Sequence, residues 1–378
     1  MIYLIPLVLM IIGYSKYDFP KRKTKDFILW GLLYLVLVSI IGLRYKVGGD
    51  TYNYMAYFEY APELSFWTPI DVSGFEPGFT LFSSLIKTYF DDIYVYQSII
   101  SAIMTFFLMR FIKQNTIYKY LAFLLIYVAI YIYFSTEVIR ESLAVVLFLQ
   151  IYPLLEKKKY FLYYPLCLLL LTIHTSAVIT LFIPFFRNLK FKKQFRIYLV
   201  CTIVCGLLLS IIMQKLAAFS IFQKLMRYDQ HSYVGYAWVG FRFIYFSILP
   251  LFVLYVCKKY RMVCKYENII CLQILFGFGM WFVPIVFQRL INYTIIFYLV
   301  SLSCIIGTCL RNRVYLSSLS YIARKNRKVL ARVILISTLL THSSFYIHLN
   351  FYERYIPYHS IFDPVTEPLR EKYVAGQD

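Results

Sequence analysis

The sequence predicts an all-α polytopic membrane protein, and three observations support that prediction. Of the 378 residues, 61% are hydrophobic and only 15% are charged. The mean hydropathy is +0.65. Apolar runs recur from residue 2 to residue 348 with only short basic interruptions, which leaves no room for a separate soluble domain. We therefore expect a single integral membrane domain over residues 1–378.

The distribution of charge predicts the topology. The formal net charge is +20, but the lysines and arginines are gathered in short clusters between the apolar runs. Cytoplasmic loops beside anionic lipid have this character, so the charge favours membrane lipid, and not nucleic acid, as the partner. Residues 1–14 are apolar and precede the basic cluster at 21–25, which favours a retained first span with its N terminus outside.

Residues 27–43 then run outward and lead into an external loop at 44–76. The next apolar segment, Phe79–Phe90, has about a dozen residues, so a helix of roughly 18 Å would be too short for a hydrocarbon core of roughly 30 Å. We expect a re-entrant or interfacial helix on the external side at residues 79–90, with Pro77 near its start. Further spans are expected at residues 93–112, 120–134 and 138–155.

The apolar run Tyr160–Phe186 has basic clusters on both sides, at 157–159 and at 187–196. Both ends therefore favour the cytoplasm, and a single span cannot satisfy both. Two short helices that meet near His174 would satisfy them. The sequence thus predicts a broken hairpin, which at membrane depth is tolerated only where it lines a cavity or packs inside protein.

The second half of the chain continues the alternation. Spans are expected at residues 197–213, 241–257, 268–287, 291–310 and 333–348, with an external segment at 214–240, a tight external turn at 288–292, a basic cytoplasmic loop at 311–332 and an external tail at 352–378. The total is about twelve transmembrane helices with both termini outside.

Four arginines fall at or near the outer ends of spans from different helix pairs, namely Arg44, Arg140, Arg242 and Arg289. A charge at this depth is costly without water or a charged partner, and the planar guanidinium binds phosphate oxygens bidentately. Convergence of these side chains would suit a diphosphate group. Snorkelling of each arginine to the interface is the alternative interpretation.

Three carboxylates and one histidine lie in the same predicted external regions. Asp50, Glu76 and Glu141 are candidate countercharges, and Asp50 or Glu76 could also serve as a general base. His174 is either a base near the external surface or a histidine bonded to a neighbouring carbonyl. The tyrosine-rich stretch 52–60, which includes Tyr54, offers faces for sugar rings or for interfacial packing. No metal-ligand spacing occurs, and the eight cysteines contain no CxxC pair.

Five motifs carry a resemblance to a known family. They are Arg44-x3-Gly48-Gly49-Asp50-Thr51 with Tyr54, Glu76-Pro77-Gly78-Phe79, Ile139-Arg140-x3-Ala144, His174-x-Ser176-Ala177 and Ile356-Pro357-Tyr358-His359-Ser360-Ile361-Phe362. In this order and spacing they resemble the EpsG-like branch of the Wzy-type O-antigen and exopolysaccharide polymerases, over nearly the whole chain. One departure is Glu141, where the resemblance leads us to expect a neutral polar residue after the arginine.

The resemblance implies a glycosyltransferase that polymerises lipid-linked oligosaccharide repeat units at the external face of the bacterial inner membrane. It would transfer the growing glycan from undecaprenyl diphosphate to the next lipid-linked repeat, without a cofactor or metal. The expected partners are these substrates, membrane lipid and a chain-length regulator. Candidate catalytic residues are His174, Asp50 and Glu76, and candidate substrate-binding residues are Arg44, Arg140, Arg242, Arg289, Tyr54 and Glu141. A flippase or exporter of lipid-linked oligosaccharide, and a glycan ligase or acyltransferase, are the alternatives.

Overall fold

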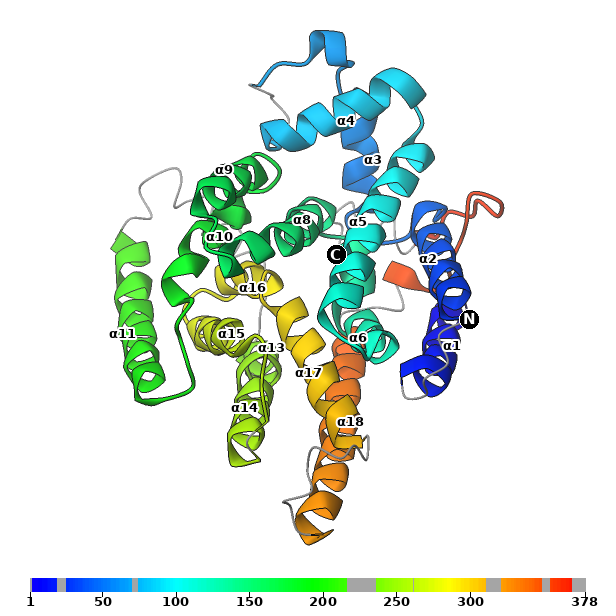
Figure 1. Cartoon of the computed structure of the whole chain (residues 1–378). Helices are drawn as coiled ribbons and strands as arrows, with labels where there is room; N and C mark the ends of the chain where they lie inside the picture. Colours follow the sequence, from blue (N-terminus) through cyan, green and yellow to red (C-terminus); the bar gives the residue numbers. More distant parts are fainter. Residues whose placement is uncertain are drawn as a thin grey trace. The chain divides into compact units, whose positions relative to one another are not determined.

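The computed structural model describes residues 2–18, 25–69, 74–215, 236–260, 262–310, 321–348 and 354–368, and every regular element named within these ranges is helical (Figure 1). The chain divides into two compact units. Unit 1 comprises Met1–Leu181, Arg311–Arg313 and Leu339–Asp378, and unit 2 comprises Phe182–Leu310 and Val314–Thr338.

The N-terminal helices belong to unit 1. They are α1 (Leu4–Gly13), η1 (Tyr14–Asp18), α2 (Asp26–Gly42), α3 (Thr51–Tyr60), η2 (Leu64–Phe66), α4 (Pro77–Phe90), α5 (Ile93–Asn115), α6 (Lys119–Ile126), η3 (Tyr127–Tyr131), α7 (Ile132–Thr136), α8 (Ile139–Glu156), α9 (Tyr160–Leu171) and η4 (Thr175–Val178). Helix α2 packs against α5, and α5 packs against α8. Leu33, Leu37 and Ile41 recur on one buried face of α2, because residues four apart lie on the same side of a helix. The other face of α2 exposes Phe27 and Leu35, as expected of a surface toward lipid.

Three helical segments are long and apolar enough to cross a membrane. They are Ile93–Asn115, Lys119–Thr136 and Val239–Lys259, and a fourth span results if Pro284–Asn292 and Ile295–Leu310 are counted together across their 55° bend. The protein is therefore an all-helical membrane protein, with three to four clear candidate spans in the described residues. The predicted total of about twelve is not confirmed, because many of the remaining apolar helices have only 10–17 residues.

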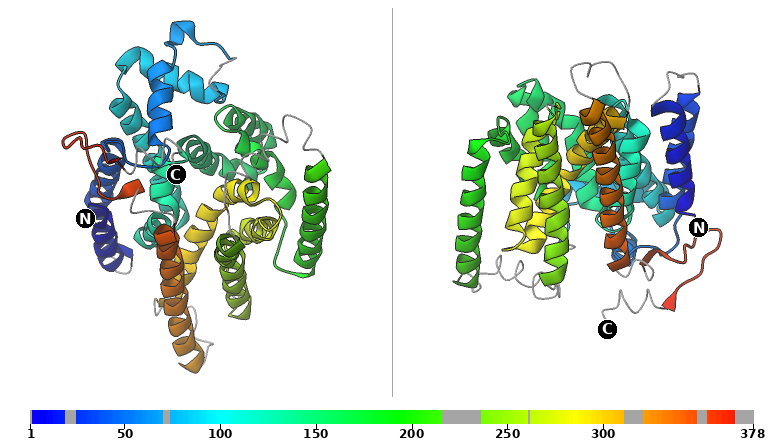
Figure 2. Two further views of the ribbon diagram at one scale, coloured as in Figure 1. Left: turned by 180° about the vertical axis from the view of Figure 1, so that it is seen from behind. Right: turned by 90° about the horizontal axis from the view of Figure 1, so that it is seen from below.

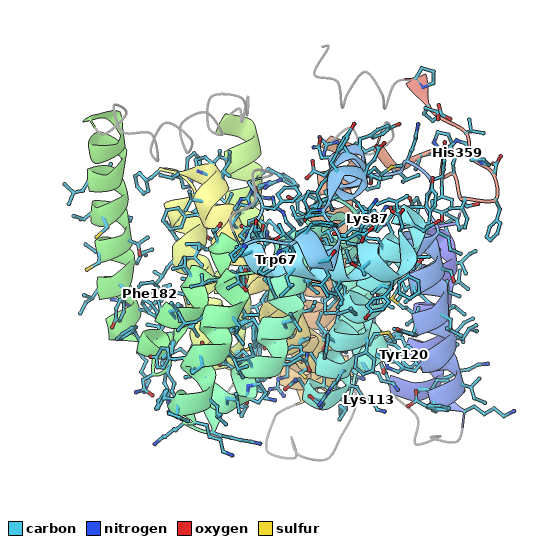
Figure 3. All side chains as sticks on the ribbon, turned by 90° about the horizontal axis from the view of Figure 1, so that it is seen from above. Trp67, Lys87, Lys113, Tyr120, Phe182 and His359 are labelled. Carbon is cyan, nitrogen blue, oxygen red and sulfur yellow. The ribbon has the colours of Figure 1, made fainter. Side chains whose placement is uncertain are left out.

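The short helix predicted at Phe79–Phe90 is present as α4. Pro77 occupies its first turn, where a missing N–H costs little. Asp91 ends the helix in the left-handed conformation, with φ of 39°. Helix α4 runs crosswise to α2 (Figures 1 and 3), as an interfacial helix would. The Trp67 indole N–H donates to Thr80 Oγ1 at 3.0 Å and ties the preceding loop to α4.

The helix break predicted near His174 is also present. Helix α9 ends at Leu171, and the 3-10 turn η4 begins at Thr175. The Ser176 N–H donates to the His174 imidazole at 3.1 Å, so the His174 side chain caps the new turn. The turn is followed by α10 (Ile179–Phe182) and η5 (Ile183–Phe186).

The end of the described chain packs against the beginning of unit 1, as the red and blue segments in Figure 2 show. The Tyr45 N–H donates to the His359 carbonyl at 2.9 Å, and the Ile361 N–H donates to the Leu43 carbonyl at 3.0 Å. These bonds flank one antiparallel bridge between Arg44 and Ser360. We call the paired segments 43–48 and 354–361, with Thr136 and Glu137, the C-terminal clasp.

Unit 2 contains α11 (Lys193–Lys215), α13 (Tyr236–Phe243), η7 (Ile244–Ile248), α14 (Leu249–Lys259), α15 (Glu267–Gly279), α16 (Pro284–Asn292) and α17 (Ile295–Leu310), while α18 spans Tyr321–His348. Helix α15 lies at the centre and contacts α11, α14, α16 and α17. The tight turn predicted at residues 288–292 is wrong, because these residues form the end of α16. The chain bends instead at 280–283 and at 293–294, since Pro284 favours a helix start. Most of the predicted external segment 214–240, part of the basic loop 311–332 and part of the tail 352–378 lie outside the described residues.

Candidate active site

Arg140 and Glu76 form an ion pair within unit 1. Arg140 is the second residue of α8, and Glu76 directly precedes α4. Arg140 Nη1 donates to Glu76 Oε2 at 2.7 Å. The two side chains are 22% and 12% exposed, so the pair is largely shielded but within reach of a ligand. The second carboxylate oxygen, Glu76 Oε1, accepts the Thr175 N–H at 3.0 Å. Both oxygens of the Glu76 carboxylate are thus engaged.

Aromatic rings surround the guanidinium. The Arg140 Cζ lies 4.0 Å from the centroid of the Phe75 ring and 6.0 Å from that of Phe79. This geometry favours a cation–π interaction. Tyr57 and Tyr54 pack on Phe75, with ring centroids 4.3 and 6.3 Å away. The rings hold the guanidinium plane in place, while Arg140 Nε has no hydrogen-bond partner among the described residues.

The start of α4 is fastened to the helix break. The Gly78 and Phe79 N–H groups both donate to the Thr172 carbonyl, at 2.7 and 3.2 Å. A Cβ atom on residue 78 would collide with the side chain and backbone of Thr172. Glycine at this position therefore allows the close approach that brings Glu76 to the Thr175 N–H.

Burial and charge act in opposite directions on the pKa of Glu76. Burial by itself raises the pKa, but the Arg140 guanidinium and the Thr175 N–H stabilise the carboxylate and outweigh it, so the pKa lies below its usual value. Glu76 is consequently a weak base while Arg140 is its partner. Burial raises the pKa of the neighbouring Tyr54 phenol, although Arg140 partly opposes that rise.

His174 lies beside this cluster and is 4% exposed. Its Nδ1 accepts the Ser176 N–H and is 2.6 Å from Ser176 Oγ. A neutral imidazole that accepts at Nδ1 carries its proton at Nε2. In that state Nε2 carries a hydrogen that it can donate, and the part of His174 as a base stays a prediction.

Asp50 and Glu141 are the other two carboxylate candidates. Asp50 precedes α3, and its carbonyl accepts the Tyr54 N–H at 3.1 Å. Glu141 is 1% exposed in the first turn of α8, where a negative charge is favoured by the helix dipole. We define the Arg140 site as Tyr54, Phe75, Glu76, Phe79, Arg140, His174 and Thr175.

Arg44 lies in the C-terminal clasp and is 1% exposed. Its Nε donates to the Val47 carbonyl at 3.1 Å, and its Nη1 donates to the Ile41 carbonyl at 2.5 Å. Burial lowers the pKa of the guanidinium to about 10. These two hydrogen bonds join Arg44 to the backbone at the end of α2, and its part in a diphosphate site stays a prediction.

Glu137 is the central side chain of the clasp, and the sequence analysis did not single it out. It accepts a hydrogen bond from the Tyr355 hydroxyl, and Arg354 Nη1 donates to its Oε2 at 2.8 Å. The Gly48 N–H donates to the Arg354 carbonyl at 3.1 Å. Glu137 precedes Arg140 by three residues, in the polar stretch between α7 and α8. That polarity was the available signal, but its partners lie more than 200 residues away in the sequence.

Arg242 and Arg289 belong to unit 2. Arg242 is 3% exposed in α13, and Arg289 is half-buried in the last turn of α16. Their part in a diphosphate site stays a prediction. Within the described ranges, no three His, Cys, Asp or Glu side chains come together in a way that could hold a metal ion.

The comparisons with known proteins agree with the motif pattern. The EpsG family matches residues 27–360, which is most of the chain and includes the Arg140 site and nearly all of the clasp. The comparison with curated proteins and the comparison with solved structures give no match. On the family match, this membrane protein belongs to the EpsG family.

Proposed function

We propose that the protein polymerises lipid-linked oligosaccharide repeat units. It transfers a growing glycan from undecaprenyl diphosphate to the non-reducing end of the next lipid-linked repeat. The EpsG family is associated with polysaccharide-polymerase activity. The observation that carries the proposal is that three motifs meet at the Glu76 carboxylate: Arg140 pairs with it, Thr175 of the motif His174–Ala177 donates to it, and it belongs to the motif Glu76–Phe79.

The glycosyl transfer requires only a few groups from the site. The leaving group is already activated as a diphosphate, so the enzyme needs a cation where negative charge develops as the glycosidic bond breaks. The Arg140 guanidinium, fixed on Phe75, supplies that cation. The acceptor hydroxyl needs a base within hydrogen-bond reach. Among the candidates Glu76, His174 and Asp50, Glu76 is the one in contact with Arg140.

The proposal includes a location and further partners. We place the reaction at the external face of the bacterial inner membrane, with both termini on that side. The membrane lipid and a chain-length regulator are the other expected partners. Arg242 and Arg289 are proposed as additional diphosphate-binding residues, and Tyr54, Asp50 and Glu141 as groups that line the substrate.

The test is polymerisation by purified protein in nanodiscs, supplied with one lipid-linked repeat unit. We expect a ladder of products spaced by one repeat. The ladder should disappear in Arg140→Gln and remain in Arg110→Gln, which removes an exposed arginine at the far end of α5. If the substrate instead crosses the membrane of liposomes unchanged, the protein is an exporter. Transfer of the glycan to a different acceptor would identify a ligase.

A further inference from the structure

We propose that the Glu76 carboxylate occupies the place of the donor diphosphate in the resting protein, and that it becomes the base for the acceptor hydroxyl once the diphosphate displaces it. This inference rests on the proposed function and deepens it. It assigns to one residue two successive states and sets the order in which the two substrates are used.

The contacts of Glu76 are those expected of a bound anion. Its two oxygens take one donor from a guanidinium, at 2.7 Å, and one backbone N–H, at 3.0 Å. Arginine side chains and backbone N–H groups are also the usual ligands of phosphate oxygens. A diphosphate that binds Arg140 must compete with Glu76 for these donors. The 12% exposure of the Glu76 side chain leaves a route for that exchange.

The surroundings allow Glu76 to leave without dismantling the site. Arg140 stays in place because its guanidinium stacks on Phe75 independently of the carboxylate. The backbone at the start of α4 stays in place because Gly78 and Phe79 bond to the Thr172 carbonyl. Only the side-chain torsions of Glu76 need to change. A rotation of this kind moves the carboxylate by a few Å, which keeps it near the donor diphosphate.

Displacement by the diphosphate makes Glu76 a stronger base. While the pair is intact, Arg140 and the Thr175 N–H hold the pKa of Glu76 below its usual value, although burial acts the other way. Once the diphosphate neutralises Arg140, burial and the added negative charge both raise the pKa. The neighbouring titratable groups are His174, Tyr54 and Arg140, and Asp50 lies near Tyr54. The Nδ1 of His174 accepts the Ser176 N–H, whereas the Glu76 carboxylate contacts Arg140 directly, so the inference assigns the role of base to Glu76.

The glycosyl transfer then conserves atoms and charge. The acceptor hydroxyl oxygen forms a bond to the anomeric carbon of the donor glycan, and the bond from that carbon to the diphosphate oxygen breaks. The hydroxyl proton passes to Glu76, and the electron pair of the broken bond remains on undecaprenyl diphosphate beside Arg140. When this product leaves, Glu76 loses its proton to water and returns to Arg140. The acceptor is activated only while a donor is bound.

The experiment measures diphosphate binding and turnover in the same variants. Farnesyl diphosphate, a short polyprenyl diphosphate without sugar, serves as the binding probe for protein in nanodiscs. In Glu76→Gln the competing charge is gone, so we expect binding about threefold to tenfold tighter than in the wild type. The kcat for polymerisation should fall by about 10²-fold or more because the base is lost. A purely structural residue would weaken both binding and turnover.

A matched control is Asp91→Asn, which removes a carboxylate at the opposite end of α4, where Asp91 pairs with Lys87 at 2.5 Å. It should change neither quantity. Glu76→Asp should bind farnesyl diphosphate like the wild type and recover part of kcat. Weaker or unchanged binding in Glu76→Gln, or an unchanged kcat, would overturn the inference even if the wild type makes polymer. Absence of polymer from the wild type would instead overturn the proposed function, whatever the binding results.

Discussion

Arg44 and Arg140 are both motif arginines that the sequence assigns to a diphosphate, yet the structure surrounds them differently. Arg44 is 1% exposed and donates to the carbonyls of Ile41 and Val47. Arg140 is 22% exposed, stacks on Phe75 and pairs with a carboxylate. One guanidinium completes the backbone hydrogen bonds of a helix end, and the other is held by side chains that a ligand can replace.

The difference shows how partner type separates structural from functional arginines. Backbone carbonyls cannot move away without unfolding the loop, so a guanidinium that donates to them stabilises the fold. A carboxylate side chain can rotate away and be exchanged for another anion. The clasp around Arg44 therefore joins the ends of unit 1, while the Arg140 site retains a replaceable partner.

The largest expected effect is on activity at Arg140. In Arg140→Ala we expect kcat/KM for polymerisation to fall by about 10²–10³-fold, since a cation at the leaving group is lost. Arg140→Lys should recover only part of it, because lysine keeps the charge but not the planar stacking on Phe75. The apparent melting temperature of both variants should stay within a few degrees of the wild type. Near-normal chain length in Arg140→Ala would remove Arg140 from the mechanism.

The next effect is on stability at Arg44. Arg44→Ala leaves two buried carbonyls without their donors and creates a cavity, so we expect a loss of about 2–4 kcal/mol in the free energy of unfolding. Thermal unfolding in detergent measures it. The activity of the protein that remains folded should change by less than about twofold, because Arg44 bonds to backbone carbonyls and not to a replaceable anion. A stable Arg44→Ala variant that has lost polymerisation would return Arg44 to the diphosphate site.

A smaller effect on stability and activity is expected where α4 meets the helix break near His174. Gly78→Ala places a methyl group against Thr172, so the start of α4 must shift, at a cost of about 1–3 kcal/mol. Because Glu76 and Phe75 move with it, polymerisation should fall together with stability. Gly31→Ala is the matched control, since nothing lies within 4 Å of a Cβ atom built at Gly31. Equal behaviour of the two variants would show that the approach of α4 to Thr172 does not position the site.

The smallest effect concerns the clasp. Tyr355→Phe removes the hydroxyl that bonds to Glu137 and leaves one carboxylate oxygen buried without this donor. We expect a loss of about 1–2 kcal/mol in the free energy of unfolding, with little change in kcat. Tyr89→Phe removes a hydroxyl from a side chain that is 71% exposed and should be neutral. A loss of kcat in Tyr355→Phe without a loss of stability would place the clasp within the catalytic machinery.

Several features of the fold follow from local sequence. The short helix at α4 and the break at His174 were both predictable, because they depend on segment length, on Pro77 and on basic clusters at both ends of one apolar run. The prediction of a turn at residues 288–292 is wrong, because the polar residues there do not form a loop and instead continue a helix that begins at Pro284. Polar residues alone do not end a helix, and capping and packing decide where it stops.

Apolar runs and short motifs are local properties, so they were sufficient to identify a helical membrane protein and the motifs of its family. They also supplied Arg140, Glu76 and His174 as candidates. The folded chain was needed to show that these three share one site, that Arg44 bonds to backbone, and that Glu137 bonds to Arg354 and Tyr355. Except for the bonds of Arg44, whose partners lie three positions away, these pairings join residues that are tens to hundreds of positions apart in the chain. They depend on which helix starts pack together, and hydropathy and charge along a single chain do not encode that directly.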